Sequence, residues 1–274
     1  MTRALIILLC LGGLPLTGLS AVAATPFELG EQAEKELRIY DARDLFRQAL
    51  RETPAAPGVA EHTAWFLYLN GFHDEECRDL LRQAMPQAQQ PAAMERAARH
   101  IERELGLRPP AEAAEQEEQR AFHRTMVEQA TGGTDEQLGG ALVDAGDYDR
   151  GIPLLEKALA ADPTNGPLEL RLARAYVWSQ KLPAADATYE RLLQRHPGNP
   201  ALLLEQGQVA ARRTLLERAQ MILAAAEQAR PGEQRILNER KSVEAQRAQL
   251  AAAAQEKPAA VPKEALPALS LIHI

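Results

Sequence analysis

Residue types that carry out chemistry are sparse in this sequence, and only one pair has a suggestive spacing. His73 and Cys77 are four residues apart, so on a helix they would share one face and could both bind a metal ion. The alternative is that Gly71 to Asp74 form a turn and that Cys77 is a small packing residue at the start of the next helix. Four further histidines fall at no spacing that completes a metal site: His62, His100, His123 and His196. Because two ligands do not make a site, we expect neither a metal ion nor a cofactor.

Two glycine pairs and the arginine-rich stretches give no better candidate for catalysis. Gly132-Gly133 and Gly139-Gly140 are neither preceded by a predicted strand nor followed by Gly-Lys-Ser/Thr, as a phosphate loop would be. The arginines at 212–213 and 235–247 alternate with Glu and Gln, which is typical of solvated helix faces. The sequence therefore predicts no catalytic residue and no enzyme activity. A metal-dependent enzyme near His73 and Cys77 is the weakest of the functional alternatives.

The composition limits both the kind of core and the kind of partner. Only 4% of the 274 residues are aromatic, which favours many small contacts between helices over one large core. The formal charge is −7, and the charges are spread along the chain. Since phosphate binding requires a basic face, this argues against nucleic acid as a partner. The chain has two cysteines, and only Cys77 would remain after removal of an N-terminal leader, so no intrachain disulfide is expected.

Three prolines at a fixed interval indicate an internal repeat. Pro163, Pro197 and Pro231 are each 34 residues apart, a period that is typical of stacked helical hairpins. Because proline lacks an N–H and disfavours helical geometry in the residue before it, we expect each proline to follow the second helix of its unit. The register defines three units, at 132–165, 166–199 and 200–233.

The small residues of these units agree with the register. Two antiparallel helices approach closely only where their side chains are small. The small positions are Gly139, Ala173 and Gly207 in the first helices and Gly151, Ala185 and Ala219 in the second. The segments 141–148 and 158–163 resemble the tetratricopeptide repeat family, although Asp135, Glu169 and Gln206 depart from its pattern. The resemblance implies an all-α fold, an α-solenoid of antiparallel helix hairpins.

The same register extends weakly toward the N-terminus and fails beyond Pro231. Placing Pro54 opposite Pro163 gives one unit at about 23–56 and a weaker one near 57–90. After Pro231 a lysine would occupy the small position, and the sequence becomes polar. We therefore divide this part of the chain into degenerate hairpins at 24–108, an acidic irregular or helical connector at 109–131, three repeats at 132–233, a capping or solvated helix at 234–256 and a Pro/Ala linker at 257–268.

The two ends of the chain predict export and a continuation. Arg3, the apolar run from Ala4 to Leu11 and the small residues before Ala24 are typical of a bacterial signal peptide at 1–23, cleaved near Ala23. We expect a protein in the periplasm or outside the cell, with no transmembrane helix in its mature part. Residues 269–274 match the translation of a sequencing adaptor, so we expect the natural protein to continue beyond about Ala268.

The family resemblance implies a binding function on the concave surface that stacked first helices present. It places eight residues on that surface: Asp144, Leu170, Arg174, Val177, Trp178, Leu204, Gln208 and Arg212. Trp and Arg are enriched at binding hot spots, although Trp178 could instead pack against the next repeat. We expect a scaffold that binds a protein segment, of unknown identity, in the cell envelope. The alternative is the periplasmic part of an outer-membrane export protein, in which a β-barrel follows the repeats and the complex secretes exopolysaccharide.

Overall fold

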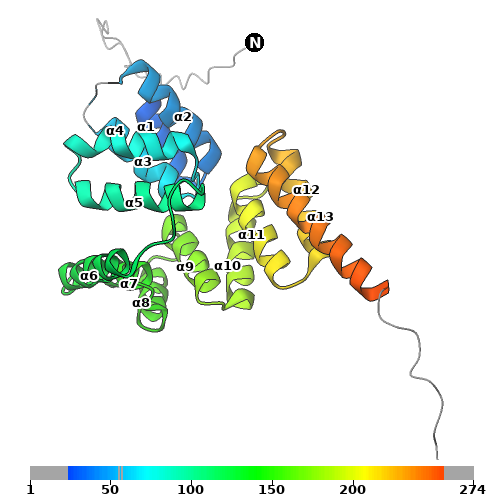
Figure 1. The fold of residues 1–274 in the computed structure, drawn as a ribbon. Helices are drawn as coiled ribbons and strands as arrows, with labels where there is room; N and C mark the ends of the chain where they lie inside the picture. The colour runs from blue at the N-terminus through cyan, green and yellow to red at the C-terminus, as the bar shows by residue number, and fades with distance from the viewer. Residues whose placement is uncertain (1–23, 55, 57, 256–274) are drawn as a thin grey trace, which may run out of the picture.

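The structure is a computed structural model that describes residues 24–54, 56 and 58–255. In this range the chain forms thirteen α-helices, one short 3-10 helix and no strand (Figure 1). The elements are α1 (Pro26–Lys35), α2 (Ile39–Glu52), α3 (Val59–Leu69), α4 (Glu75–Ala84), the 3-10 helix η1 (Met85–Gln87), α5 (Pro91–Glu104), α6 (Ala113–Ala130), α7 (Asp135–Asp144), α8 (Tyr148–Ala161), α9 (Gly166–Trp178), α10 (Leu182–Arg195), α11 (Pro200–Arg212), α12 (Leu216–Ala229) and α13 (Gln234–Gln255). The all-α prediction is confirmed.

Three of the predicted segments lie outside the described residues. These are the signal peptide at 1–23, the linker at 257–268 and the adaptor-like end at 269–274. Among the helices that the structure does describe, none combines the length and the apolar character that a membrane span requires.

Consecutive helices pack as hairpins wherever small residues let them approach. The hairpins in the described range are α1–α2, α3–α4, α7–α8, α9–α10 and α11–α12. A Cβ atom added to Gly151 of α8 would lie 2.8 Å from the carbonyl oxygen of Gly139 in α7, so these two helices cross with their backbones in contact. A Cβ on Gly30 of α1 would lie 2.6 Å from the ring of Phe46 in α2. The small positions therefore mark the points where helices meet.

The ends of the repeat helices follow the proline register. Helices α8, α10 and α12 each end two residues before a register proline. The asparagines at the following turns cap the next helix: the side chain of Asn165 accepts a hydrogen bond from the backbone N–H of Leu168 at 3.0 Å, and that of Asn199 accepts one from Ala201 at 3.1 Å. These caps satisfy N–H groups that have no partner within their own helix.

The N-terminal helices fold back onto the repeats. We call α1–α5 the N-terminal block and α7–α13 the repeat block. Leu37, in the turn between α1 and α2, has a positive φ of 59° and is only 2% exposed because it packs among Leu170, Tyr189 and their neighbours in the repeat block. The side-chain amide of Asn199 donates a hydrogen bond to the carbonyl oxygen of Leu37 at 2.7 Å. Apolar packing and a buried hydrogen bond thus hold the turn in place.

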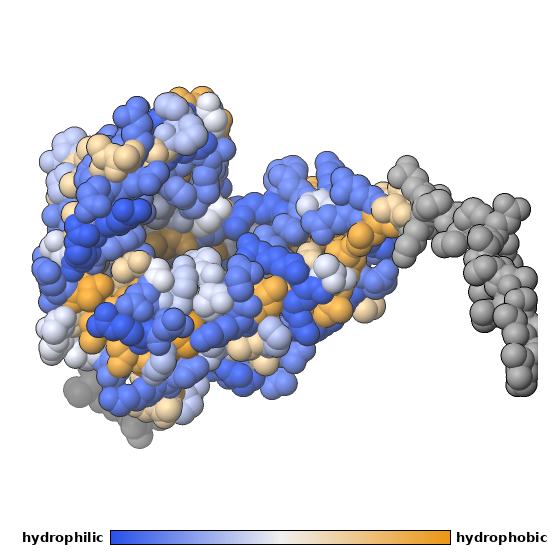
Figure 2. Space-filling model, turned by 60° about the horizontal axis from the view of Figure 1, so that its bottom comes forward, coloured by the Kyte–Doolittle hydropathy of each residue, from blue (hydrophilic) through white to orange (hydrophobic). Residues whose placement is uncertain are grey.

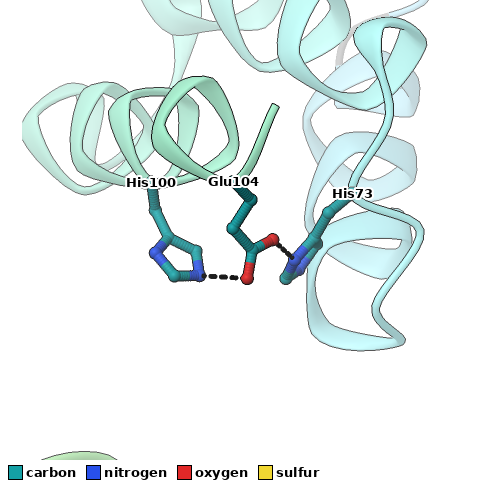
Figure 3. Close-up of side chains that lie close together, drawn as sticks. All are labelled: His73, His100 and Glu104. Carbon is teal, nitrogen blue, oxygen red and sulfur yellow. Dashed lines mark hydrogen bonds and ion pairs between the residues drawn. The ribbon is translucent and has the colours of Figure 1, made fainter. Parts of the chain in front are cut away.

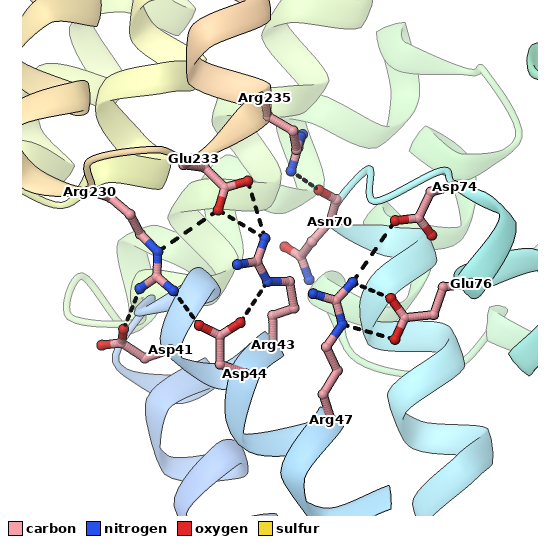
Figure 4. Close-up of polar contacts among 10 residues, drawn as sticks. All are labelled: Asp41, Arg43, Asp44, Arg47, Asn70, Asp74, Glu76, Arg230, Glu233 and Arg235. Atoms are coloured by element: carbon pink, nitrogen blue, oxygen red, sulfur yellow. Dashed lines mark hydrogen bonds and ion pairs between the residues drawn. The ribbon is translucent and has the colours of Figure 1, made fainter. Parts of the chain in front are cut away.

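A network of charged and polar side chains fastens the same two blocks at a second place (Figure 4). Arg43 of α2 lies 3.0 Å from the carboxylate of Glu233, in the turn before α13, and both side chains are nearly buried. Arg230 pairs with two aspartates of α2. Arg235 of α13 donates to the carbonyl oxygen of Asn70, in the loop after α3, at 3.0 Å. The loop after α3 is therefore held directly against the repeat block.

The acidic connector contains a helix that lies on the surface. No residue of α6 is buried. It is held by arginines of α5: the guanidinium of Arg96 lies 3.6 Å from the ring centre of Phe122, and that of Arg103 lies 3.2 Å from the carboxylate of Glu115. Such contacts between partly exposed groups contribute only modestly to stability. Helix α6 therefore covers the end of the N-terminal block without joining its core.

Candidate partner-binding groove

A groove runs between the N-terminal block and the first helices of the repeats, and we call it the interblock groove. It consists of two adjoining clefts of about 470 and 480 Å³. The inner cleft extends over α9, α11 and the start of α13, and the outer cleft extends over α6 and α7. Four residues line both clefts: Tyr68, Leu69, His100 and Trp178. In Figure 2 the surface is mostly hydrophilic, with hydrophobic residues gathered in a recess and in bands between helices.

The middle of the interblock groove carries two exposed apolar side chains, one from each block. Trp178, at the end of α9, is 49% exposed, and Leu69, at the end of α3, is 66% exposed. Tyr68 and Trp65 line the groove beside them, with their rings in edge contact at 5.9 Å. Large exposed apolar residues that gather in a concave site are typical of a binding surface. Of the two interpretations of Trp178, the structure favours exposure in the groove over burial against the next repeat.

Arg174 has a structural role in the wall of the groove. Its guanidinium donates two hydrogen bonds to the carboxylate of Glu205, at 2.9 and 2.6 Å, and Tyr189 donates a third to the same carboxylate at 2.7 Å. Burial opposes the charged form, yet the neighbouring carboxylate raises the pKa of Arg174 further above its ordinary value. Arg174 also donates to the side-chain oxygen of Asn70 at 3.2 Å. Its charge is therefore already neutralised, and it joins the two blocks.

Two of the residues predicted for the concave surface offer a partner almost no area. Leu170 is 4% exposed and Leu204 is 2% exposed. Leu170 packs among buried residues of α9, α10 and α11, and Leu204 belongs to the cluster that joins α11 to the N-terminal block. The prediction failed for these two residues because it assumed an open concave face, whereas helices and the N-terminal block cover them. We remove both from the candidate surface.

The remaining predicted residues lie along the interblock groove. Val177, Gln208 and Arg212 line the inner cleft together with Arg174 and Trp178. Gln208 donates to Glu239 of α13 at 3.1 Å, and Arg212 is exposed at the end of α11. Asp144 lines the outer cleft and lies 2.7 Å from the guanidinium of Arg171. Six of the eight predicted residues therefore lie in one continuous site.

The sequence-based prediction missed the wall that the N-terminal block contributes. The aromatic pair Trp65 and Tyr68, the exposed Leu69 and the polar loop after them lie outside the regular repeats. Their position depends on how the blocks dock, and no local pattern encodes that. One signal was present: His100 and Glu104 are four residues apart on a predicted helix and therefore share one face.

The structure separates His73 from Cys77 and gives His73 other neighbours. His73 lies in the loop before α4, so the helical spacing argument does not apply to the pair. Cys77 is fully buried, its thiol donates to the carbonyl oxygen of Ala64 at 3.8 Å, and burial raises its pKa to about 12. The interpretation of Cys77 as a packing residue fits this environment. His73 instead lies beside His100 and Glu104 of α5 (Figure 3).

The described residues form an all-α helical-repeat fold with a groove between its two blocks. A family model described as tetratricopeptide repeat matches residues 142–203, which include most of the first two predicted repeats. Residues 142–203 are therefore assigned to the tetratricopeptide repeat family. No curated protein sequence matches it significantly.

Solved structures of tetratricopeptide repeat proteins are similar to this chain at low identity. The second such domain of human RPAP3, solved in complex with an HSP70 peptide, is 20% identical, with 40% of this chain and 92% of that chain covered and a TM-score of 0.37. A thermophilic protein of Thermus thermophilus is 16% identical, with 80% and 96% covered and a TM-score of 0.36. The C-terminal part of a repeat protein of Cytophaga hutchinsonii is 15% identical, with 84% and 90% covered and a TM-score of 0.38. The assignment of residues 142–203 to the family rests on the sequence match.

Proposed function

We propose that this protein is a non-catalytic scaffold that binds an extended segment of a partner protein in the interblock groove. The observation that carries the proposal is the exposed pair Trp178 and Leu69, presented by two different blocks in the middle of the groove. Exposing both side chains to water is unfavourable, and a partner side chain inserted between them would bury apolar area at roughly 25 cal/mol per Å².

The shape of the interblock groove favours an extended segment over a small molecule. Its two clefts share four residues around Trp178, and each has further lining residues of its own, so together they form a site that is longer than either cleft. Its lining alternates aromatic and apolar side chains with amides and charged groups, which suits a peptide whose backbone needs hydrogen bonds and whose side chains need pockets. Arg212 is exposed and lines only the inner cleft, so it can meet an acidic side chain of that segment.

The proposal is tested with peptides selected from a displayed library against the purified chain. We expect a selected peptide to lose at least about tenfold in affinity when Trp178→Ala or Leu69→Ala removes an apolar anchor, because hot-spot truncations cost about 2 kcal/mol or more. Met221→Ala is the matched control, since Met221 is 68% exposed on α12 and lines neither cleft. Equal affinity for all three variants would contradict the proposal.

We further propose that the scaffold acts in the cell envelope. The support is the signal peptide predicted at 1–23, and protease accessibility of the mature chain in spheroplasts of its source cell tests this. If the mature chain is digested only after lysis, the proposed location is wrong. The export-protein alternative depends on the reading frame of the natural gene after the codon for residue 268. An uninterrupted frame with about ten-residue segments of alternating hydrophobicity would favour it, and a nearby stop codon would favour the free scaffold.

A further inference from the structure

One cluster of ligating side chains lies on the wall of the inner cleft and is not needed for the scaffold role. It consists of His73, from the loop between α3 and α4, and of His100 and Glu104, one turn apart on α5 (Figure 3). Their ligand atoms all lie within 4.8 Å of one another. Glu104 stands between the two imidazoles: one carboxylate oxygen is 2.5 Å from Nδ1 of His73, and the other is 3.4 Å from Nε2 of His100.

The hydrogen bonding of His73 leaves an electron-rich atom facing the carboxylate. Its Nε2 lies 2.9 Å from the carbonyl oxygen of Tyr68. A carbonyl oxygen only accepts, so Nε2 must carry the hydrogen, and in neutral His73 the lone pair is on Nδ1. That lone pair points at an oxygen of Glu104 only 2.5 Å away. Two such atoms repel each other unless a cation, either a proton or a metal ion, lies between them.

The donor set and its outer contacts suit a divalent transition metal. Two imidazole nitrogens and one carboxylate oxygen form the three-protein-ligand pattern of zinc sites that keep a fourth position open. Ligands at 2.0–2.1 Å around a tetrahedral ion lie roughly 3.3 Å apart, and the His100 to Glu104 distance of 3.4 Å matches this. Glu104 is half exposed, so its side chain can withdraw slightly from His73. The Tyr68 carbonyl on the far nitrogen of His73 is the kind of outer contact that orients metal-bound histidines.

Aromatic packing holds the two imidazoles in position before any ion binds. The ring of Tyr68 stacks on His73 with centres 5.0 Å apart and meets the edge of His100 at 6.0 Å. The two imidazoles are 5.5 Å apart, at nearly a right angle. Because Tyr68 is largely buried, it restrains both ligands at once. The folded protein has therefore already lost the conformational entropy of these two side chains, so metal binding does not have to order them.

We propose that His73, His100 and Glu104 bind one zinc ion or a similar divalent transition-metal ion on the wall of the interblock groove. All three residues line the inner cleft, so the fourth coordination position opens toward the groove and is available to water or to a ligand from an occupant. The site joins the loop before α4 to α5 and stands independently of the proposed partner.

The test is metal binding by the untagged chain, measured by zinc titration calorimetry and by the visible absorption of bound Co²⁺. We expect one equivalent to bind. His100→Ala and Glu104→Gln should weaken binding by at least about tenfold, since loss of even an outer-shell contact typically has that effect. His100 is partly exposed and Gln is isosteric with Glu, so both variants should fold, which circular dichroism verifies.

The matched control is His62→Ala. His62 faces Glu34 at 3.2 Å, and among the described residues this pair has no third ligand beside it, so removal of His62 should leave the affinity unchanged. The proposal is overturned if the unmodified chain binds no zinc, if either cluster variant binds as the unmodified chain does, or if His62→Ala weakens binding to the same extent.

Discussion

The contact between Leu37 and Gly166 shows how the two blocks dock, and it can be tested quantitatively. A Cβ atom added to Gly166, the first residue of α9, would lie 3.2 Å from Cδ1 and 3.6 Å from Cγ of Leu37. Truncating a buried leucine to alanine costs about 2–5 kcal/mol of unfolding free energy, and more where neighbours cannot fill the cavity. Gly166 has no side chain to move into the space. We therefore expect Leu37→Ala to cost about 3–5 kcal/mol.

The same geometry predicts that a second substitution has opposite effects in the two backgrounds. In the unmodified protein, Gly166→Ala crowds Leu37 and should destabilise the fold by about 1 kcal/mol. In the Leu37→Ala variant the added methyl group enters the cavity and should restore about 0.8 kcal/mol. Urea denaturation followed by circular dichroism gives the four free energies of this double-mutant cycle.

A leucine outside this contact serves as the control for the cycle. Leu29 is 45% exposed on α1, so Leu29→Ala should change stability by no more than about 0.5 kcal/mol. The docking through Leu37 is wrong if Leu37→Ala costs less than about 1 kcal/mol, or if Gly166→Ala has the same effect with and without the leucine.

Two further predictions concern single residues inside the hairpins. Gly151→Ala should destabilise the protein by about 1–3 kcal/mol, because the new methyl group would meet the backbone of Gly139 at 2.8 Å; an unchanged thermal midpoint would show that the two helices are not in backbone contact. Cys77 should react with a maleimide at pH 8 far more slowly in the native protein than in urea, because burial raises its pKa to about 12 and leaves little thiolate; rapid labelling of the native protein would show that this site is open.

The repeat could be predicted because its signals are local. Proline and asparagine end and begin helices through their own backbone chemistry, and the helices end two residues before the prolines that set the register. Glycine and alanine mark helix crossings within a single hairpin. Each of these signals acts over a few residues or over one hairpin. One 34-residue period therefore contains the information needed to place the two helices of each repeat.

Two of the three polar residues that broke the repeat pattern, Glu169 and Gln206, proved to be buried and paired. Glu169 is 3% exposed and lies 2.9 Å from the guanidinium of Arg191. Gln206 donates to Asp186 at 3.2 Å, and Arg218 donates to the same aspartate. The partners are separated by at least 20 residues. The sequence therefore showed that these residues depart from the repeat pattern, but it did not show that each has a polar partner in the fold. A buried polar group is tolerated when its hydrogen bonds are satisfied.

Only one wall of the interblock groove could be predicted from the sequence. The wall from the first helices followed from the repeat, whereas the opposite wall depends on the docking of α1–α5. Docking rests on Leu37, a non-glycine residue at positive φ, and on the distant hydrogen bond from Asn199. Within the N-terminal block, the packing of α5 against α4 brings His73 and His100 together from two different elements. Neither contact has a periodic signature, and both arise only from tertiary packing.

The most direct test of the central claim, that an extended partner segment lies along the interblock groove, is site-specific photo-crosslinking of a selected peptide. A photoreactive aromatic residue, which keeps an apolar ring at position 178, replaces Met126, Trp178 or Arg212, which line the outer cleft, both clefts and the inner cleft. Met221 on α12 serves as the outer-face control. We expect the three groove positions to attach, in that order, to successive residues of the peptide and position 221 to attach to none. Attachment from position 221 alone, or from the groove positions without order along the peptide, would contradict the claim.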